Sequence, residues 1–535
     1  MRYWFLSLVL VLDGLGVIAQ GSFFGGLQVN TNFYVRDSAI GAYGPHYDNL
    51  KSSTDGWLNL DYTNDKYLFD LGMRLDMFNH SNLHTPGVPY SDVGIGNFYV
   101  RKRGEKYRVT GGYFYDQFGS GIVFRAYEDR TLGIDNAILG IHLEAEPVQK
   151  LKIKAFTGVQ KNRLSLFKPI LIGLNAEYDF SIGKKVRFTP GISVVNRTLD
   201  EATMDFIVSN IETYDPKGRF VPKYNVYLFG GYNTLTIGNF SWYAEAAGKT
   251  TEAIASTVRA DSLVNRSGYI LYSTMNYAIS RFGAALQFKR TENFPFRVSL
   301  LRGPAAFEGV INFIPPVTRQ NALRLPARYN ATVQELEELA YSGDINFSPI
   351  AKKLTINFSY AESRDFENEL KFREAFGNVE LKFKKEWKGN VGLQFIQYDQ
   401  FFYQRDKFGD YRLVNAIAPF AQVTWKVSKK HSLAFDAQAQ FTDEDFGSWL
   451  YGSIEYNIAP WFSLAASDMY NYSPNPESPV SDKIHYYQFF TSFTYQQHVL
   501  TLAYSRQVAG IVCTGGVCRY EPAFSGVKLT LNSTF

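Results

Sequence analysis

Apolar and polar residues alternate along much of this chain. Between Tyr67 and Met77, every second residue is large and apolar, whereas Asp70, Arg74 and Asp76 occupy positions in between. A period of two is typical of a β-strand, because successive side chains point to opposite faces of a sheet. The same alternation recurs at residues 27–35, 57–63, 151–156, 353–360, 432–441 and 526–535.

Two all-β architectures produce alternating strands, and they place the apolar face differently. A soluble sandwich buries that face, whereas a membrane-spanning barrel turns it toward lipid. The strand-like segments here run for about 9 to 12 residues, which is the length needed to cross a bilayer at the usual tilt. Short and long connections also alternate, as they do in bacterial outer-membrane barrels. The short connections include 64–66, 103–106, 147–150, 181–185, 428–431, 459–460 and 496–497, and the long ones 36–56, 79–93, 198–222, 250–268 and 399–411.

We therefore predict an all-β fold: a single transmembrane, antiparallel, up-and-down β-barrel of about 24 strands, within a range of about 20 to 26. An even strand number places both termini in the periplasm beside the short turns, with the long loops outside the cell. The stripe from Tyr67 to Met77 then faces lipid, and Asp70, Arg74 and Asp76 face a watery or plugged lumen as candidate constriction residues. A soluble all-β protein is the alternative.

The beginning of the chain has the pattern of a secretory signal peptide. Arg2 supplies a positive start, Trp4–Leu12 an apolar stretch, and Ala19-Gln20 a small-residue end. We expect residues 1–20 to be the signal peptide and residues 21–535 to form the barrel. No later apolar run is long enough to cross a bilayer as a helix, so we predict an exported protein that is integral to the outer membrane.

Composition and charge narrow the partners. Aromatic residues make up 16% of the chain, and their clusters near strand ends, as at Phe401–Tyr403 and Tyr486–Phe490, suit the aromatic girdles of membrane barrels. The 55 basic and 51 acidic residues leave a formal charge of only +4. Without a basic stripe, this composition argues against a nucleic-acid partner.

Three blocks of sequence resemble a known family. YDQFGSGIVFRAYEDRTLGIDNAILG (Tyr115–Gly140), NFIPPVTRQNALRLP (Asn312–Pro326) and GGVCRYEPAFSGVKLTLNSTF (Gly515–Phe535) resemble a Bacteroidota outer-membrane β-barrel family of unknown function, DUF6029. The resemblance implies the fold and the location but no activity, so no catalytic residue is carried over. The final strand, ending in Phe535, also resembles the signal read by the barrel-insertion machinery, which is therefore an expected partner beside outer-membrane lipid.

Five charged residues fall close together within the first of these blocks. They are Arg125, Glu128, Asp129, Arg130 and Asp135. Folded inward, they would form a charged constriction or contact a solute. Alternatively, they would form a salt-bridged loop or a network on the barrel wall.

The longest connection runs from about Asn293 to Glu335 and is rich in arginine. Before Glu335, only Glu308 opposes these cations. A barrel of this size has a wide lumen that is usually plugged or narrowed, and the segment could narrow it and favour anionic solutes. The alternative is a loop that projects outward. The arginines are Arg297, Arg302, Arg319, Arg324 and Arg328.

Two further loop features bear on chemistry. Cys513 and Cys518 are the only cysteines, and they flank a hairpin-like TGGV in a protein that we expect in an oxidising compartment. This spacing predicts a disulfide that stiffens an outer loop.

Thr442–Gly447 (TDEDFG) holds three carboxylates, which we interpret as solvated charge, with weak Ca²⁺ binding as the alternative. We predict no metal and no cofactor.

No enzyme motif is visible: the chain lacks G-x-S-x-G, H-E-x-x-H, C-x-x-C, a P-loop and a dinucleotide fingerprint. The leading hypothesis is a porin-like or ligand-selective channel that passes solutes through a polar, loop-narrowed lumen. The alternatives are a non-conducting barrel in a secretion or surface-assembly complex and an enzyme acting on envelope lipid or polymer. Strand-like alternation begins at about Leu27, which argues against a plugged TonB-dependent transporter. The solute and the oligomeric state cannot be read from the sequence.

Overall fold

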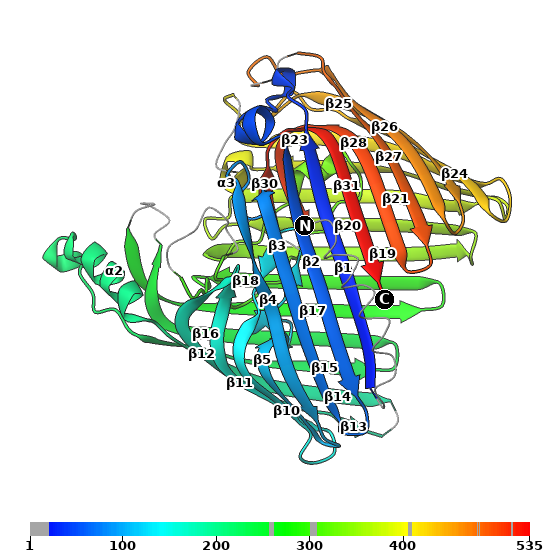
Figure 1. The fold of residues 1–535 in the computed structure, drawn as a ribbon. Helices are drawn as coiled ribbons and strands as arrows, with labels where there is room; N and C mark the ends of the chain where they lie inside the picture. The colour runs from blue at the N-terminus through cyan, green and yellow to red at the C-terminus, as the bar shows by residue number, and fades with distance from the viewer. Residues whose placement is uncertain are drawn as a thin grey trace, which may run out of the picture.

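The computed structural model describes residues 21–183, 185–255, 262–299, 308–404, 409–478, 480, 482–514 and 517–535, with side chains at all of these except 511–514 and 517–518. The chain forms a closed, up-and-down barrel of 24 antiparallel strands, as predicted, and the first strand pairs with the last to complete the ring (Figure 1). The barrel strands are β1 Gly21–Tyr34, β2 Ser52–Asn64, β3 Phe69–Ser81, β4 Tyr90–Arg103, β5 Tyr107–Phe114, β10 Ile138–Ala145, β11 Leu151–Asn162, β12 Ser165–Tyr178 with its continuation β13 Phe180–Ile182, β14 Val186–Thr198, β15 Asn225–Ile237, β16 Phe240–Ala255, β17 Leu263–Ile279, β18 Phe282–Glu292, β19 Glu337–Ile350, β20 Leu354–Arg364, β21 Leu370–Lys382, β22 Trp387–Tyr398, β23 Val414–Lys426, β24 His431–Gln440, β25 Ser448–Ile458, β26 Phe462–Ser473, β27 His485–Tyr495, β28 His498–Gln507 and β31 Phe524–Thr534.

Shorter elements lie in the connections. Three small hairpins occur there, formed by β6 Asp116–Phe118 with β7 Phe124–Ala126, β8 Glu128–Asp129 with β9 Ile134–Asp135, and β29 Gly510–Thr514 with β30 Val517–Glu521. The helices are α2 Glu201–Glu212, α3 Gln400–Gln404 and the short turns η1 Ser38–Ile40, η2 His46–Leu50, η3 Pro216–Gly218 and η4 Pro326–Tyr329. Within the described residues, no helix is both long and apolar enough to cross a membrane.

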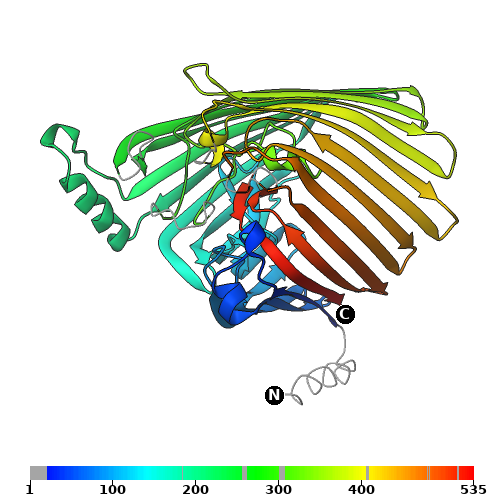
Figure 2. The same ribbon diagram turned by 90° about the horizontal axis from the view of Figure 1, so that it is seen from above.

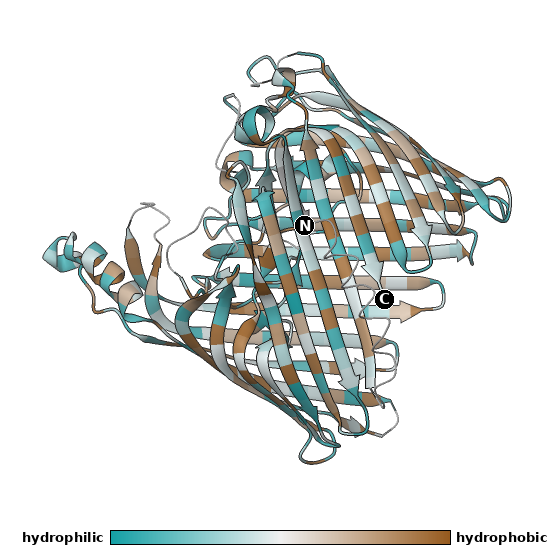
Figure 3. Cartoon of the chain, viewed as in Figure 1, coloured by the Kyte–Doolittle hydropathy of each residue, from teal (hydrophilic) through white to brown (hydrophobic). Residues whose placement is uncertain are grey.

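The alternating pattern separates the two faces of the wall. On β3, Leu71, Met73 and Met77 are exposed on the outer surface, whereas Arg74 and Asp76 are buried on the inner side. Figure 3 shows the same alternation of hydrophobic and hydrophilic bands along strand after strand. An apolar outer surface on a closed barrel is what a lipid bilayer requires, because every strand's backbone groups are paired and no edge remains.

Two details differ from the pattern-based expectation. Tyr67 lies in the turn before β3 rather than in the strand, because Leu68 adopts a left-handed conformation (φ 52°) that ends the strand geometry. The connection predicted at residues 250–268 is also shorter than expected, because β16 continues to Ala255 and β17 begins at Leu263.

Helix α2 was not predicted and stands out from the barrel in the long connection between β14 and β15 (Figure 1). Met204, Ile207 and Ile211 lie on one face of the helix and pack against Ala253 and Leu263 at the ends of β16 and β17. Their spacing of three and four residues is the helical period. The sequence therefore carried a signal for this helix within what was interpreted only as a long loop.

Candidate functional site: a plug inside the barrel

Two connections fold into the barrel. We call residues 115–137, between β5 and β10, together with residues 293–299 and 308–336, between β18 and β19, the plug. Figure 2 shows coil and short strands crossing the middle of the ring of strands. In the first part, Gly119 and Gly121 have φ values of 52° and 100°, and glycine tolerates this conformation where the chain turns between β6 and β7.

One half of the plug rests on an apolar core inside the lumen. Burial of this apolar surface stabilises the plug by about 25 cal/mol per Å². The prediction of a polar lumen is wrong for this region, because the inner face of several strands is apolar here. The plug contributes Phe118, Ile122, Val123, Phe124, Ala126, Phe294, Phe296, Val298, Ile311 and Ile314, and the wall contributes Phe114, Ile138, Phe156, Leu171, Val195, Val226, Leu228, Ala247 and Ile270.

The sequence carried a signal for this core. Along Ile170–Leu174 of β12, the outer residues Ile170 and Ile172 are exposed, and Leu171 between them is fully buried inside. The strand is thus apolar on both faces, which is the pattern of a strand that is covered on both sides. Here lipid covers one face and the plug covers the other.

Buried cations on the wall hold the backbone of the plug. Lys249 Nζ donates to the Pro295 carbonyl oxygen at 2.6 Å, and Lys289 Nζ donates to the Pro315 carbonyl oxygen at 3.0 Å. Arg197 Nη1 donates to the carbonyl oxygen of residue 297 at 2.7 Å. These contacts come from β14, β16 and β18. Of the two orientations left open by the sequence, the described residues of this segment, 293–299 and 308–336, therefore take the inward one.

Carboxylates compensate these buried cations. Glu252 lies 2.8 Å from Arg197 and 2.6 Å from Lys249, and Glu338 lies 2.8 Å from Lys289. Buried charges persist in proteins when they are paired and hydrogen-bonded. The cationic donors of the wall are therefore held in place to bind the plug, and their charge is balanced by neighbouring carboxylates.

The segment then reaches the connection between β24 and β25 and helix α3. Arg328 Nε lies 2.6 Å from Asp445 Oδ2, and that carboxylate also accepts hydrogen bonds from the Tyr329 hydroxyl at 3.0 Å and from Gln400 Nε2 at 2.8 Å. Asp445 is 0% exposed, so the interpretation of its loop as solvated charge is wrong for this residue. Burial by itself lowers the pKa of Arg328, but the Asp445 carboxylate outweighs it and the pKa is raised.

The remaining arginines of the segment have separate environments. Arg319 stacks on the Phe376 ring at 3.7 Å, and Arg297 pairs with Glu335 at 2.8 Å. Arg324 forms no ion pair or hydrogen bond within the described part of the chain. Arg302 lies outside the described residues. Most of these cations are therefore engaged within the protein rather than offered to a solute.

A charged network ties the first part of the plug to β3 and β11. Arg74 contacts Asp76 (Nε–Oδ1 2.6 Å), Glu128 (Nη1–Oε1 2.7 Å) and Asp135 (Nη2–Oδ2 2.5 Å). Lys161 Nζ lies 2.6 Å from the same Asp135 carboxylate. The structure thus brings four of the candidate residues together. Lys161 was missed, because a β-bulge between Val159 and Lys161 turns two consecutive side chains inward and interrupts the alternation.

The other candidates lie around this network or apart from it. Asp70 lies near the short-turn end of the barrel, and Asp129 accepts hydrogen bonds within its own turn. Asp70 pairs with Arg103 (Oδ1–Nη2 3.2 Å), Arg125 stacks on Phe313 at 4.1 Å, Arg130 pairs with Glu128 (Nε–Oε1 2.8 Å), and Asp129 Oδ1 accepts a hydrogen bond from the Thr131 backbone N–H at 2.9 Å.

A polar cavity lies in the short-turn half of the barrel, beside the plug. We call this cavity of about 580 Å³ the vestibule; Arg319 and Leu323 of the plug line one side of it. Amide and carboxylate side chains on the inner wall are joined in a ladder. Asn357 Nδ2 donates to Glu380 at 3.1 Å, Asn390 Nδ2 donates to Gln422 at 3.0 Å, and Gln422 Nε2 donates to Asp436 at 3.0 Å.

The cysteine pair lies in the β29–β30 hairpin, where the backbones of Cys513 and Cys518 are directly opposite each other. Their side chains lie outside the described residues, so the disulfide stays a prediction. We expect that unfolding without a reductant exposes no alkylatable thiol and that prior reduction exposes two. Mass spectrometry after iodoacetamide treatment measures this. A double mass increment in the unreduced protein would show free thiols.

Within the part of the chain that the structure describes, no group of three or more His, Cys, Asp or Glu side chains is placed to hold a metal ion. No curated protein sequence matches this chain. Solved barrels resemble it at low identity. The translocation pore of the P pilus usher PapC aligns with a TM-score of 0.48 and 7% identity, over 96% of this chain and 99% of that chain.

Two other barrels align less closely. The siderophore receptor PirA from Pseudomonas aeruginosa gives a TM-score of 0.44 at 7% identity, over 96% of this chain and 80% of that chain. OccK8 (OprE) from the same species gives 0.38 at 8%, over 84% and 98%. At such low TM-scores and sequence identities, the similarity to these barrels does not indicate an activity. The assignment to Bacteroidota stays a prediction. The model of the family of unknown function DUF6029 matches residues 1–535, which confirms the resemblance found in the three blocks: this chain belongs to DUF6029, and its fold is an outer-membrane-type β-barrel.

Proposed function

We propose that this protein is a channel that passes small polar solutes across the outer membrane through a lumen narrowed by the plug. The observation that carries the proposal is the vestibule, whose wall is lined by hydrogen-bonding side chains while the outer surface of the same strands is apolar. Polar groups lining a pore replace part of the water that a solute loses on entering it. In this proposal the short turns and both termini face the periplasm, and Phe535, whose backbone pairs with Gly25 of β1, belongs to the insertion signal.

The charges around the vestibule favour cations. Asp344 and Glu380 line it, and the one arginine there, Arg319, is stacked on Phe376. The anion preference suggested by the arginine-rich sequence therefore has little support, since Arg297 and Arg328 are neutralised by carboxylates. A cavity lined by one sign of charge concentrates ions of the other sign.

Replacing both vestibule carboxylates, Asp344→Asn with Glu380→Gln, is expected to lower the cation-to-anion permeability ratio several-fold. The amides keep the shape and most hydrogen bonds, and they remove the negative charge. The reversal potential in a salt gradient across a planar bilayer measures the ratio. Asp65→Asn is the control, because Asp65 lies in a short turn with a side chain that is 84% exposed. An unchanged reversal potential in the double variant would contradict the proposed path.

A second candidate is a non-conducting component of a secretion or surface-assembly complex. The apolar core inside the lumen favours it, because a well-packed core resists the separation of plug and wall. Steady current from the correctly folded parent protein would exclude this candidate. Absence of current from both the parent and a variant with a loosened plug would favour it over the channel. We assign no catalytic role.

A further inference from the structure

A second cavity lies between the plug and the wall near the long-loop end. It measures about 150 Å³ and is bounded by the plug around η4, by Gln440, Trp449 and Met469 of β24 to β26, and by residues 507–510 after β28. An apolar cavity of about this size can hold a benzene-sized molecule. The cavity is separate from the vestibule, and the two share no lining residue.

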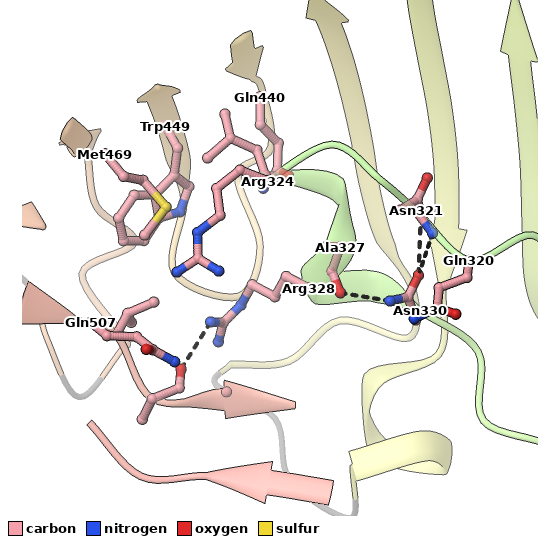
Figure 4. A pocket seen from close by; sticks show the side chains of 14 residues that line it. Gln320, Asn321, Arg324, Ala327, Arg328, Asn330, Gln440, Trp449, Met469 and Gln507 are labelled. Atoms are coloured by element: carbon pink, nitrogen blue, oxygen red, sulfur yellow. Dashed lines mark hydrogen bonds between the residues drawn. The ribbon is translucent and has the colours of Figure 1, made fainter. Parts of the chain in front are cut away.

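Two guanidinium groups point into this space. Figure 4 shows the side chains of Arg324 and Arg328 directed toward the same region, with Trp449 and Met469 on one side and Gln507 on another. Arg328 is occupied by Asp445 and by the Ala509 carbonyl oxygen, to which its Nη1 donates at 3.2 Å. Arg324 has no partner within the described part of the chain, although its side chain is accessible to water.

Other polar groups of the cavity also lack partners. The indole N–H of Trp449 is buried without a hydrogen-bond acceptor, and Trp449 is only 3% exposed. The Oε1 atom of Gln440, another lining residue, is also buried and unpaired, but it is an acceptor. A buried donor left unpaired is unfavourable, because it has lost its hydrogen bond to water and gained none in return. The unpaired Trp449 N–H and the Arg324 guanidinium therefore indicate that an acceptor belongs here, beside the apolar side chains of Leu325, Met469 and Val508.

The local charge is also positive. Lys528 of β31 donates to Gln507 Oε1 at 3.2 Å, which places a further cation behind the cavity wall. Asp445 balances Arg328, and Glu521 is engaged by Arg519.

We propose that this cavity binds a small organic carboxylate, with the carboxylate on Arg324 and Trp449 and the apolar body against Leu325, Met469 and Val508. Arg324 is suited to this role because its planar fork matches a carboxylate with two parallel hydrogen bonds. The site holds whether or not the barrel conducts, so it does not rest on the channel proposal.

Titration with 4-fluorobenzoate, followed by ¹⁹F NMR on the refolded full-length protein in detergent, tests the site. We expect saturable binding, and at least tenfold weaker binding by Arg324→Gln, because a hydrogen bond to a charged group is lost. Trp449→Phe keeps the ring and removes the N–H, and it is expected to bind several-fold more weakly. A heat-shifted gel band confirms that each variant is folded.

Three comparisons complete the test. Arg319→Gln, a plug arginine outside the cavity, is expected to bind like the parent. Neutral 4-fluorobenzamide, which has the same shape, is expected to bind at least tenfold more weakly than the acid. The proposal is overturned if 4-fluorobenzoate does not bind, if Arg324→Gln binds it as well as the parent does, if the amide binds equally, or if inorganic phosphate binds more tightly.

Discussion

Replacing Asp445 with alanine is expected to loosen the plug from the connection between β24 and β25 and to raise the ion current severalfold or more. Asp445 is completely buried and accepts hydrogen bonds from Arg328, Tyr329 and Gln400. Removing it leaves the Arg328 guanidinium buried without a counter-ion, and breaking such a pair destabilises a protein by about 3–5 kcal/mol. The current in planar bilayers is the measurement, with a heat-shifted gel band as evidence that the barrel itself is closed.

A double variant separates loss of the ion pair from general damage. With Arg328→Met and Asp445→Leu together, no buried charge is left without a partner, and apolar replacements of similar volume are often nearly neutral. We therefore expect its current to lie closer to that of the parent than the current of Asp445→Ala does. If Asp445→Ala is folded and carries the same current as the parent, the plug does not limit conduction at this contact.

Replacing Arg74 with alanine is expected to give the largest loss of stability in the charged network. Arg74 contacts three carboxylates, those of Asp76, Glu128 and Asp135. Without it, Lys161 would remain beside Asp135 and Arg130 beside Glu128, but no cation would bridge all three. The loss in the free energy of unfolding is expected to be about 3–5 kcal/mol, as for other buried pairs that lose one partner. Denaturant unfolding of the refolded barrel in detergent measures it.

Two further variants define the cause of that loss. Arg74→Lys keeps the charge, but one ammonium cannot reproduce the fork that reaches three carboxylates, so its stability is expected to lie between that of the parent and that of Arg74→Ala. Arg108→Ala removes an arginine from the exposed pair with Glu144, and exposed pairs contribute about 0–1 kcal/mol. Equal losses for Arg108→Ala and Arg74→Ala would contradict a special role for the buried network.

The barrel wall could be predicted from the sequence because its signal is local. Each strand must show lipid an apolar residue at every second position, and the pattern repeats with every strand. Leu71, Met73 and Met77 revealed their outward orientation without reference to any other part of the chain. Helix α2 and the apolar inner face at Leu171 also left local traces, a period of three to four residues and an unbroken apolar run.

The interior was decided by tertiary structure, because its contacts join residues that are far apart in the chain. Arg328 and Asp445 are separated by 117 positions, and nothing near either residue identifies the other. Lys161 joins the network through a bulge that shifts the alternation by one residue. The sequence by itself determined a closed, lipid-facing barrel of about 24 strands. Only the fold decided that residues 293–299 and 308–336 lie inside it, because the apolar core and the buried cations that hold them are assembled from several strands of the barrel.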